Sequence, residues 1–157
     1  MEKTKFIVIK DQMDAGKTTT IWLLMMTLKE QGAGVRYFYN YKEGKEDIVP
    51  KEIPQAGDRF DFIAVLEWHD LVIVLDSRGD YAKYIVRQIK RALTNNPDYI
   101  VCAIQCRDYN NIWERFDSKF PNTKYKRICF WSEYAENAAD AILVKQPTVE
   151  AIIRYMA

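Results

Sequence analysis

Residues 7 to 20 read IVIKDQMDAGKTTT, and this stretch decides the fold class. Lys5–Lys10 is a short β-branched apolar run, which predicts a strand buried on both faces. The loop DQMDAG follows, and a helix is predicted from about Lys17 to Gln31, where apolar residues recur at helical spacing. Val35–Tyr39 returns as a strand. The chain therefore opens as a strand–helix–strand unit, with an expected right-handed crossover.

The middle of the chain holds two β-prone runs, Phe62–Glu67 and Leu71–Asp76, separated by only three residues. This spacing favours a hairpin, although a short helix within Asp58–Trp68 before a single strand is the alternative. Residues 41–58 before them carry charges, prolines and glycines without an apolar period. We expect this segment to be a long surface excursion, of the kind that often serves as a lid.

The second half alternates helical and extended patterns. The predicted elements are a helix over Tyr81–Thr94 capped by Asp80, a strand Tyr99–Gln105, a helix Asp108–Lys119, a strand Arg127–Trp131, a short helix from Glu133, a possible last strand at Ala141–Val144, and a terminal helix from Thr148. Strands that alternate with helices predict an α/β fold with three layers and a mostly parallel sheet, interrupted by an antiparallel hairpin near 62–76. We expect one domain over residues 1–157.

The amino-acid composition argues against several classes of protein. Of the 157 residues, 48% are hydrophobic, which suits a globular protein, and the net charge of +1 gives little support to a nucleic-acid partner. The opening apolar run is too short for a signal peptide or a membrane span, so we expect a cytoplasmic protein. Three cysteines and one histidine favour buried free thiols over a zinc site.

Residues Asp11–Thr18 match the pattern G-x-x-x-x-G-K-[ST] at every defined position except the first, where aspartate replaces glycine. In this pattern Gly16 lets the backbone approach a phosphate, and the N–H groups at the helix start point at the anion. Lys17 would reach the β- and γ-phosphates, and the Thr18 hydroxyl would hold Mg²⁺. The preceding strand and following helix are the context that this chemistry requires.

The loop resembles that of the P-loop NTPase superfamily, and the opening segment is most similar to nucleoside and nucleotide kinases. Met13 stands where tetrameric thymidine kinases have methionine, and Ala15–Thr19 reads A-G-K-T-T as in thymidylate kinases. The resemblance is clear over about the first 40 residues, and the zinc-binding cysteine pairs of that thymidine kinase class are absent. It implies ATP or GTP with Mg²⁺ as cofactors. The residues that it assigns to nucleotide binding are Met13, Asp14, Ala15, Gly16, Lys17, Thr18 and Thr19.

Asp11 is the departure from this pattern. Glycine permits a tight turn beside the phosphates, whereas an inward aspartate would repel them by on the order of 1 kcal/mol unless Mg²⁺ or Lys17 screens it. Asp14 adds a second carboxylate to the loop. Either one could ligate Mg²⁺ through water, or Asp11 could turn away. A loop that folds but binds nucleotide weakly is the alternative.

Asp76 ends the hydrophobic run LVIVLD, the pattern that places a carboxylate by Mg²⁺ in P-loop enzymes. We therefore assign it to catalysis and metal binding, with Asp80 as the competitor. Arg107 follows the Tyr99–Gln105 strand, at the sheet edge where α/β proteins collect ligands. With Arg115 it could supply transition-state charge, although an ion pair with a neighbouring acid would also explain it.

Two other sets of side chains have both a structural and a functional interpretation. One is a basic helix side, typical of a solvated face, formed by Lys83, Arg87, Lys90 and Arg91. The other is a set of aromatic residues that could stack on a base, although strand aromatics usually serve the core: Tyr37, Tyr39, Tyr41 and Trp68.

The sequence supports two functional hypotheses. The first is Mg²⁺-dependent phosphoryl transfer from a nucleoside triphosphate to a small nucleoside or nucleotide, or triphosphate hydrolysis, with 41–58 as acceptor site or lid. The second is a nucleotide-regulated binding protein, in which occupancy orders residues 41–58 and 76–80 and a partner protein recognises the result. A relic of the fold without nucleotide would have Asp11 in the phosphate cradle.

Overall fold

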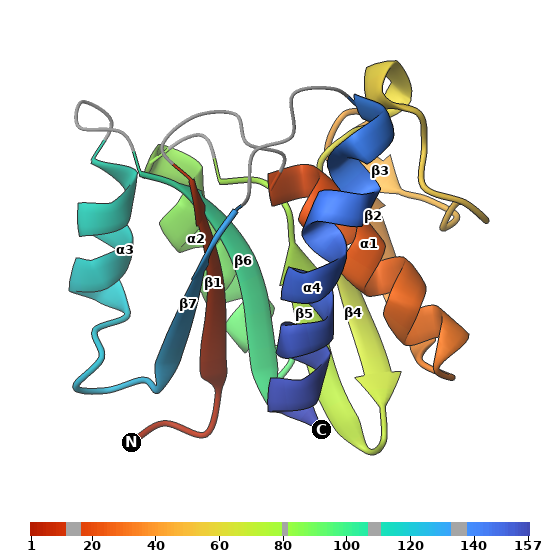
Figure 1. The fold of residues 1–157 in the computed structure, drawn as a ribbon. Helices are drawn as coiled ribbons and strands as arrows, with labels where there is room; N and C mark the ends of the chain where they lie inside the picture. Colours follow the sequence, from red (N-terminus) through yellow and green to blue (C-terminus); the bar gives the residue numbers. More distant parts are fainter. Residues whose placement is uncertain (12–16, 80–81, 107–110, 133–137) are drawn as a thin grey trace.

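The computed structural model describes residues 1–11, 17–79, 82–106, 111–132 and 138–157. Within these residues the chain forms one seven-stranded sheet with helices on both faces (Figure 1). The predicted α/β class is confirmed. None of the helices in the described ranges is long and apolar enough to cross a membrane.

The strands follow the order β3-β2-β4-β5-β6-β1-β7 across the sheet. Their bounds are β1 (Lys5–Asp11), β2 (Gly34–Asn40), β3 (Lys45–Glu46), β4 (Phe62–Trp68), β5 (Leu71–Asp76), β6 (Tyr99–Gln105) and β7 (Arg127–Trp131). Strands β5, β6, β1 and β7 pair in parallel, whereas the β4–β5, β2–β4 and β2–β3 pairs are antiparallel. The sheet is therefore mixed, with a parallel half and an antiparallel half, and not mostly parallel as predicted.

The hairpin predicted near 62–76 is confirmed, and the alternative of a short helix there is wrong. Strands β4 and β5 pair along their whole length, from Ile63 opposite Asp76 to Trp68 opposite Leu71. His69 and Asp70 make the turn with positive φ values of 48° and 63°. Two consecutive positive φ values match the twist of the flanking strands, which explains why a two-residue connection is sufficient.

The described ranges hold four α-helices and one short 3₁₀ helix: α1 (Lys17–Glu30), α2 (Ala82–Leu93), α3 (Ile112–Lys119), α4 (Ala138–Met156) and η1 (Ala56–Asp58). Helices α1 and α4 pack in the same core as Ile7 and Ile9 of β1. Helices α2 and α3 pack with the alternate residues Phe6 and Val8. Because neighbouring strand residues point to opposite faces, these two cores lie on opposite sides of the sheet.

The end of the chain differs from the prediction. Residues Ala141–Val144, expected as a possible strand, lie inside α4, which also runs through Pro147. Ile142 and Leu143 are 41% and 75% exposed, so this apolar run is not a buried strand. A short apolar run cannot by itself distinguish a strand from a helix segment, which explains the error.

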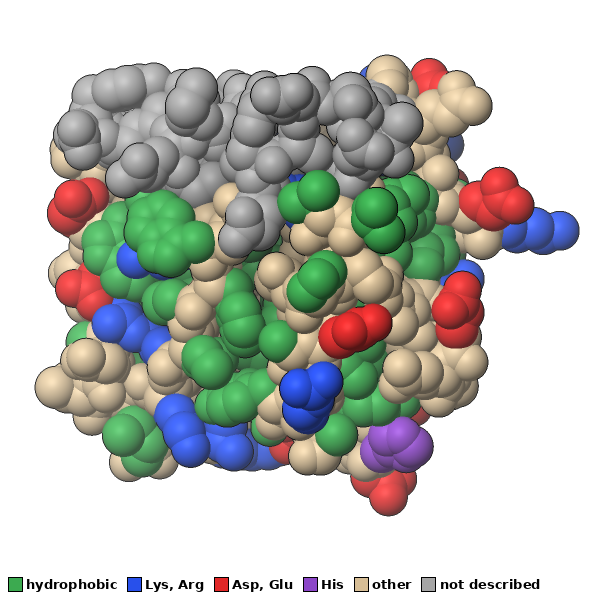
Figure 2. All heavy atoms as spheres, viewed as in Figure 1, with side chains coloured by type: hydrophobic (Ala, Val, Ile, Leu, Met, Phe, Trp, Pro, Cys, Tyr) green, Lys and Arg blue, Asp and Glu red, His purple; other side chains and the backbone are tan. Residues whose placement is uncertain are grey.

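Residues 41–58 lie only partly on the surface. They include the edge strand β3 and the helix η1, and Val49 and Ile53 are half-buried against the core on the α1 side. The face seen in Figure 1 carries exposed hydrophobic side chains at its centre, with acidic and basic side chains interspersed around them (Figure 2). This mixture agrees with the net charge of +1.

Candidate functional site

The predicted phosphate loop joins β1 to α1. Strand β1 pairs with β6 on one side and β7 on the other, and α1 begins at Lys17. The strand and the helix predicted on either side of residues 12–16 are therefore present. Met13, Asp14, Ala15 and Gly16 lie outside the described residues, as do the side chains of Asp11 and Lys17. Their proposed contacts with phosphate stay predictions.

Thr18, in the first turn of α1, contacts a carboxylate that sequence reasoning missed. Its Oγ1 donates to Oδ1 of Asp61 at 3.1 Å. The Ser77 hydroxyl donates to the same oxygen at 2.9 Å and accepts a hydrogen bond from the backbone N–H of Phe62 at 2.9 Å. Asp61 thus connects the start of α1 with the residue that follows β5.

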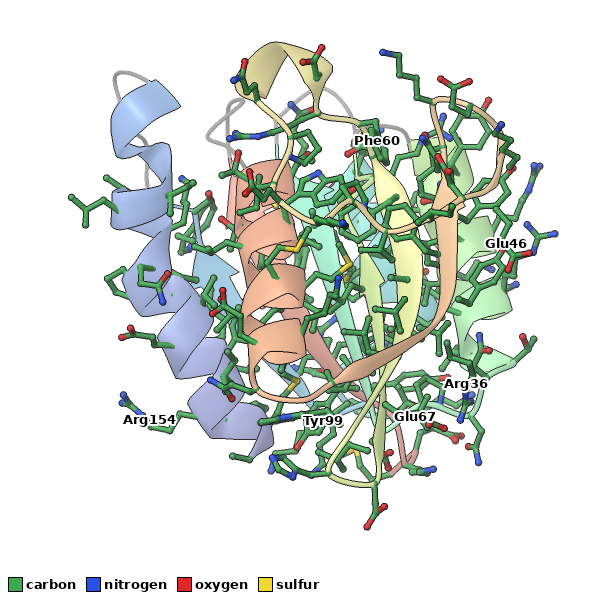
Figure 3. All side chains as sticks on the ribbon, turned by 90° about the vertical axis from the view of Figure 1, so that its right-hand side faces the viewer. Arg36, Glu46, Phe60, Glu67, Tyr99 and Arg154 are labelled. Atoms are coloured by element: carbon green, nitrogen blue, oxygen red, sulfur yellow. The ribbon has the colours of Figure 1, made fainter. Side chains whose placement is uncertain are left out.

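The segment that carries Asp61 is held against α1 by aromatic packing. The ring of Phe60 lies edge-on to Trp22 with centroids 5.2 Å apart, and the Trp22 indole N–H donates to the Phe60 carbonyl at 3.2 Å. Figure 3 shows Phe60 at the end of the sheet where η1 lies. This packing fixes the backbone beside Thr18, so the position of Asp61 does not depend on its own side chain.

Asp76 ends β5 and is 1% exposed. The Tyr41 hydroxyl donates to its Oδ2 at 3.3 Å, and the Arg78 backbone N–H donates to its Oδ1 at 3.1 Å. Burial raises the pKa of Asp76 to about 7, although these two hydrogen bonds oppose the shift, and the charge of Asp61 adds to it. Asp76 therefore titrates near neutral pH.

Tyr41 and Arg78 complete the surroundings of Asp76. Burial, followed by the neighbouring Asp76 carboxylate, raises the pKa of Tyr41, so its phenol stays protonated and keeps donating. The Arg78 guanidinium lies 5.2 Å from the Tyr41 ring centroid and 4.5 Å from that of Tyr84. Sequence reasoning had not singled out Arg78, whose only signal was its position after the acidic end of a strand.

The Thr18 hydroxyl, its partner Asp61 and the Asp76 carboxylate, whose pKa the charge of Asp61 raises, offer oxygens that suit a hard divalent cation. A hydroxyl and the carboxylates of Asp61 and Asp76 are the ligand types that Mg²⁺ prefers. In the described part of the chain no three acidic, histidine or cysteine side chains form a metal cluster. Mg²⁺ commonly completes its shell with water and substrate phosphates, so two carboxylates and a hydroxyl fit such an ion only together with a phosphate ligand.

Thr19, predicted to bind nucleotide, is buried and has a protein partner. Arg59 donates from Nη1 to the Thr19 hydroxyl at 2.7 Å and from Nε to the Pro54 carbonyl at 2.8 Å. These bonds connect residues 41–58 to the first turns of α1. A direct nucleotide contact for Thr19 stays a prediction.

The segment after Asp76 crosses close to β6. A Cβ at Gly79 would stand 1.8 Å from the Ala103 carbonyl oxygen, so only glycine fits there. The Gln105 N–H donates to the Gly79 carbonyl at 3.2 Å. The carboxyl ends of β5 and β6 are thereby held together. Arg107 and Asp80 follow these two ends and lie outside the described residues.

Comparisons with protein-family models, with curated proteins and with solved structures find no match to this chain. A functional assignment therefore depends on the sequence pattern and on the geometry around Thr18, Asp61 and Asp76.

Proposed function

We propose that this protein binds a nucleoside triphosphate with Mg²⁺ through residues 11–18 and transfers its terminal phosphoryl group to a small nucleoside or nucleotide, or to water. The observation that carries the proposal is the convergence of Thr18, Asp61 and Ser77, next to the buried Asp76. In P-loop enzymes a Ser or Thr at the helix start and an Asp at the end of a hydrophobic strand hold Mg²⁺ between them.

The sheet supports the same proposal. Strands β5, β6, β1 and β7 are parallel, so their carboxyl ends meet at one edge, and ligands of α/β proteins bind at this edge. A P-loop NTPase-like fold with three layers would account for helices on both faces and for a phosphate loop after β1, an inner strand of the parallel half. Lys17 would neutralise the β- and γ-phosphates, and Arg107 would add charge in the transition state.

The acid–base state of Asp76 fits the proposed role. Without a cation, its burial favours the protonated form near neutral pH. A divalent ion beside it favours the ionised form, so Mg²⁺ binding would release a proton from this carboxyl. In-line phosphoryl transfer needs positioning and charge neutralisation more than covalent chemistry, and these residues would supply both.

A nucleotide-regulated binding protein is the second candidate. Arg59 connects Thr19 of α1 to residues 41–58, so a change at the helix start has a direct path to that segment. If nucleosides or nucleoside monophosphates accelerate ATP consumption, the enzyme is favoured. If ATP consumption stays slow with every acceptor and a partner protein binds only the ATP form, the regulatory protein is favoured.

Thermal unfolding with ATP and with GTP, each with and without Mg²⁺, tests the shared part of both candidates. A ligand at 100 times its Kd adds about 2.7 kcal/mol to the free energy of unfolding. We expect a rise in the midpoint that requires Mg²⁺ and that Lys17→Ala removes. Equal midpoints with and without both nucleotides would contradict the proposal.

A further inference from the structure

A groove lies between β2 and α2, on the sheet face opposite α1. One side carries three tyrosines from β2 and the residue after it, and the other carries three polar residues of α2; we call it the tyrosine groove, and its defining residues are Tyr37, Tyr39, Tyr41, Arg87, Gln88 and Arg91. Ile63 and Val65 of β4 form its floor, and it encloses a cavity of about 90 Å³. One buried water needs roughly 10–15 Å³ of such volume, so the cavity has room for a ring-sized group.

The three tyrosines offer flat aromatic surfaces. Alternation along the strand places them on one face, where the rings of Tyr37 and Tyr39 lie 18° from parallel with centroids 6.5 Å apart. Tyr39 and Tyr41 meet edge to face, with centroids 5.6 Å apart. Tyr37 is 37% exposed, so this row of aromatic rings is accessible to solvent, unlike a buried core. A planar ring is the ligand shape that such surfaces bind.

Gln88 provides a buried amide without a complete set of partners. The side chain is 9% exposed and lines the groove, and no described residue donates a hydrogen bond to its Oε1. A buried acceptor left without a donor costs roughly 1–3 kcal/mol, so a purely structural role would favour an apolar residue here. Rotation of this amide toward the groove would let an N–H group of a ligand supply the missing donor.

Arg87 and Arg91 stand one helical turn apart at the rim, and both are exposed. Neither forms an ion pair with an acidic residue in the described ranges. The acids on this side include Glu46, which is opposite Tyr39 in the β2–β3 ladder and lies on the α2 side of the sheet (Figure 3), and the buried Asp76, which accepts a hydrogen bond from Tyr41. Two exposed guanidiniums one turn apart favour an anionic group on the helix side of the groove, and paired arginines suit a phosphate.

We infer that the tyrosine groove is a binding site for a nucleoside monophosphate, with the base among the tyrosines, a base N–H on Gln88 and the phosphate on Arg87 and Arg91. The site shares no residue with the 11–18 loop, so it does not depend on the proposed triphosphate binding. Tyr41 lines the groove and also donates to Asp76, so the ligand would lie next to that carboxyl. Two arginines on a nearly neutral chain fit a mononucleotide better than a polynucleotide.

Calorimetric titration of the full chain with AMP, GMP, CMP and UMP in turn, without Mg²⁺, tests this site. At least one monophosphate should bind one to one with a Kd below about 1 mM. The double variant Arg87→Ala/Arg91→Ala should weaken binding at least about tenfold, whereas Lys90→Ala removes a cation from the same helix outside the groove and should leave it unchanged. Lys17→Ala should also leave it unchanged, which separates this site from the phosphate loop.

Gln88→Leu is a second test, and its expected result differs from that of a folding defect. Because the substitution removes an unpaired buried acceptor, it should leave the thermal midpoint of the free protein equal or higher. The same variant should weaken the monophosphate at least about fivefold, since a base N–H loses its acceptor.

Four results would overturn the site. The first is that none of the four monophosphates binds, and the second is that Lys17→Ala abolishes the binding. The third is that both groove variants bind a monophosphate as tightly as the unchanged protein. The fourth is that a single-stranded oligonucleotide binds more than about tenfold tighter than every monophosphate.

Discussion

The parallel and antiparallel halves of the sheet contribute residues to the candidate site from opposite ends of their strands. In the parallel half, Asp76 lies at the carboxyl end of its strand, where α/β folds commonly bind their ligands. In the antiparallel half, Asp61 precedes β4, yet it reaches the same edge because β4 runs against β5. The two residues are 15 positions apart in the sequence, and the hairpin between them brings both to this edge, where the charge of Asp61 raises the pKa of Asp76. A strand's direction therefore decides which of its ends can contribute to the site.

Lys17→Ala has the largest expected effect on ATP affinity. The lysine follows β1 of the parallel half, and its ammonium group is the one proposed to contact the phosphates. We expect calorimetry to show a loss of ATP affinity of more than about 100-fold, with an unchanged circular dichroism spectrum. Lys29→Ala, which removes the same charge at the far end of α1, is the matched control. Retained affinity in Lys17→Ala would refute the phosphate-loop assignment.

The buried Asp76 predicts how stability depends on pH. Its pKa is raised to about 7 in the folded protein, so the folded state binds more protons than the unfolded state between about pH 4 and 7. The free energy of unfolding should therefore fall as pH rises through this window, by at most about 4 kcal/mol from this group. Urea unfolding from pH 4 to 8 measures the fall, and Asp76→Asn should flatten it. The same slope in both proteins would show that Asp76 does not titrate in this window.

Asp61→Asn and Asp76→Asn test whether both halves of the sheet serve one cation. We expect each variant to reduce Mg²⁺-dependent ATP turnover about tenfold or more while it weakens nucleotide binding much less. Raising the Mg²⁺ concentration should restore part of the lost rate. Asp70→Asn, in the exposed turn at the other end of the β4–β5 hairpin, serves as the control. If only Asp76→Asn lowers turnover, Asp61 is a structural partner of Thr18 and the parallel half acts alone.

The parallel and antiparallel halves of the sheet also differ in how well the sequence predicts their strands and site residues. Strands β6 and β7 both have the predicted bounds. The reason is clearest for β6, which is buried along its whole length and therefore has a nearly continuous apolar run. Asp61 could not be found in this way, since an acid before a strand is normally a solvated loop residue. The sequence singles out the tyrosines and the arginines of the groove but not Gln88, because only the fold brings Gln88 of α2 opposite the β2 tyrosines.

Some local features had no signal in the sequence. The passage of Gly79 over Ala103 depends on how the segment after β5 meets β6, which no pattern of either segment encodes. The contact of Arg59 with Thr19 joins residues 40 positions apart. Such contacts follow from topology, so they become predictable only once the strand order is known.

Asp11→Gly has the smallest expected effect on ATP affinity. Asp11 is the last residue of β1 and the first residue of the predicted phosphate loop. A carboxylate beside the phosphates repels them, and a Cβ restricts a turn that glycine leaves free. We expect Asp11→Gly to tighten ATP binding several-fold, most visibly without Mg²⁺, where nothing offsets the added negative charge. The gain should shrink as salt rises if it is electrostatic. Asp11→Asn separates the two causes, since it removes the charge and keeps the Cβ.

Affinity and turnover measured together decide what Asp11 does. Tighter binding with unchanged turnover would mean that the parallel half tolerates an unfavourable charge at the end of β1. Lower turnover in both Asp11→Gly and Asp11→Asn would make the carboxylate a base or a water-mediated metal ligand, and β1 would then contribute an acid to the same edge as β5. If neither quantity changes, the side chain points away from the phosphates, and the two acids that matter are the one that precedes β4 and the one that ends β5.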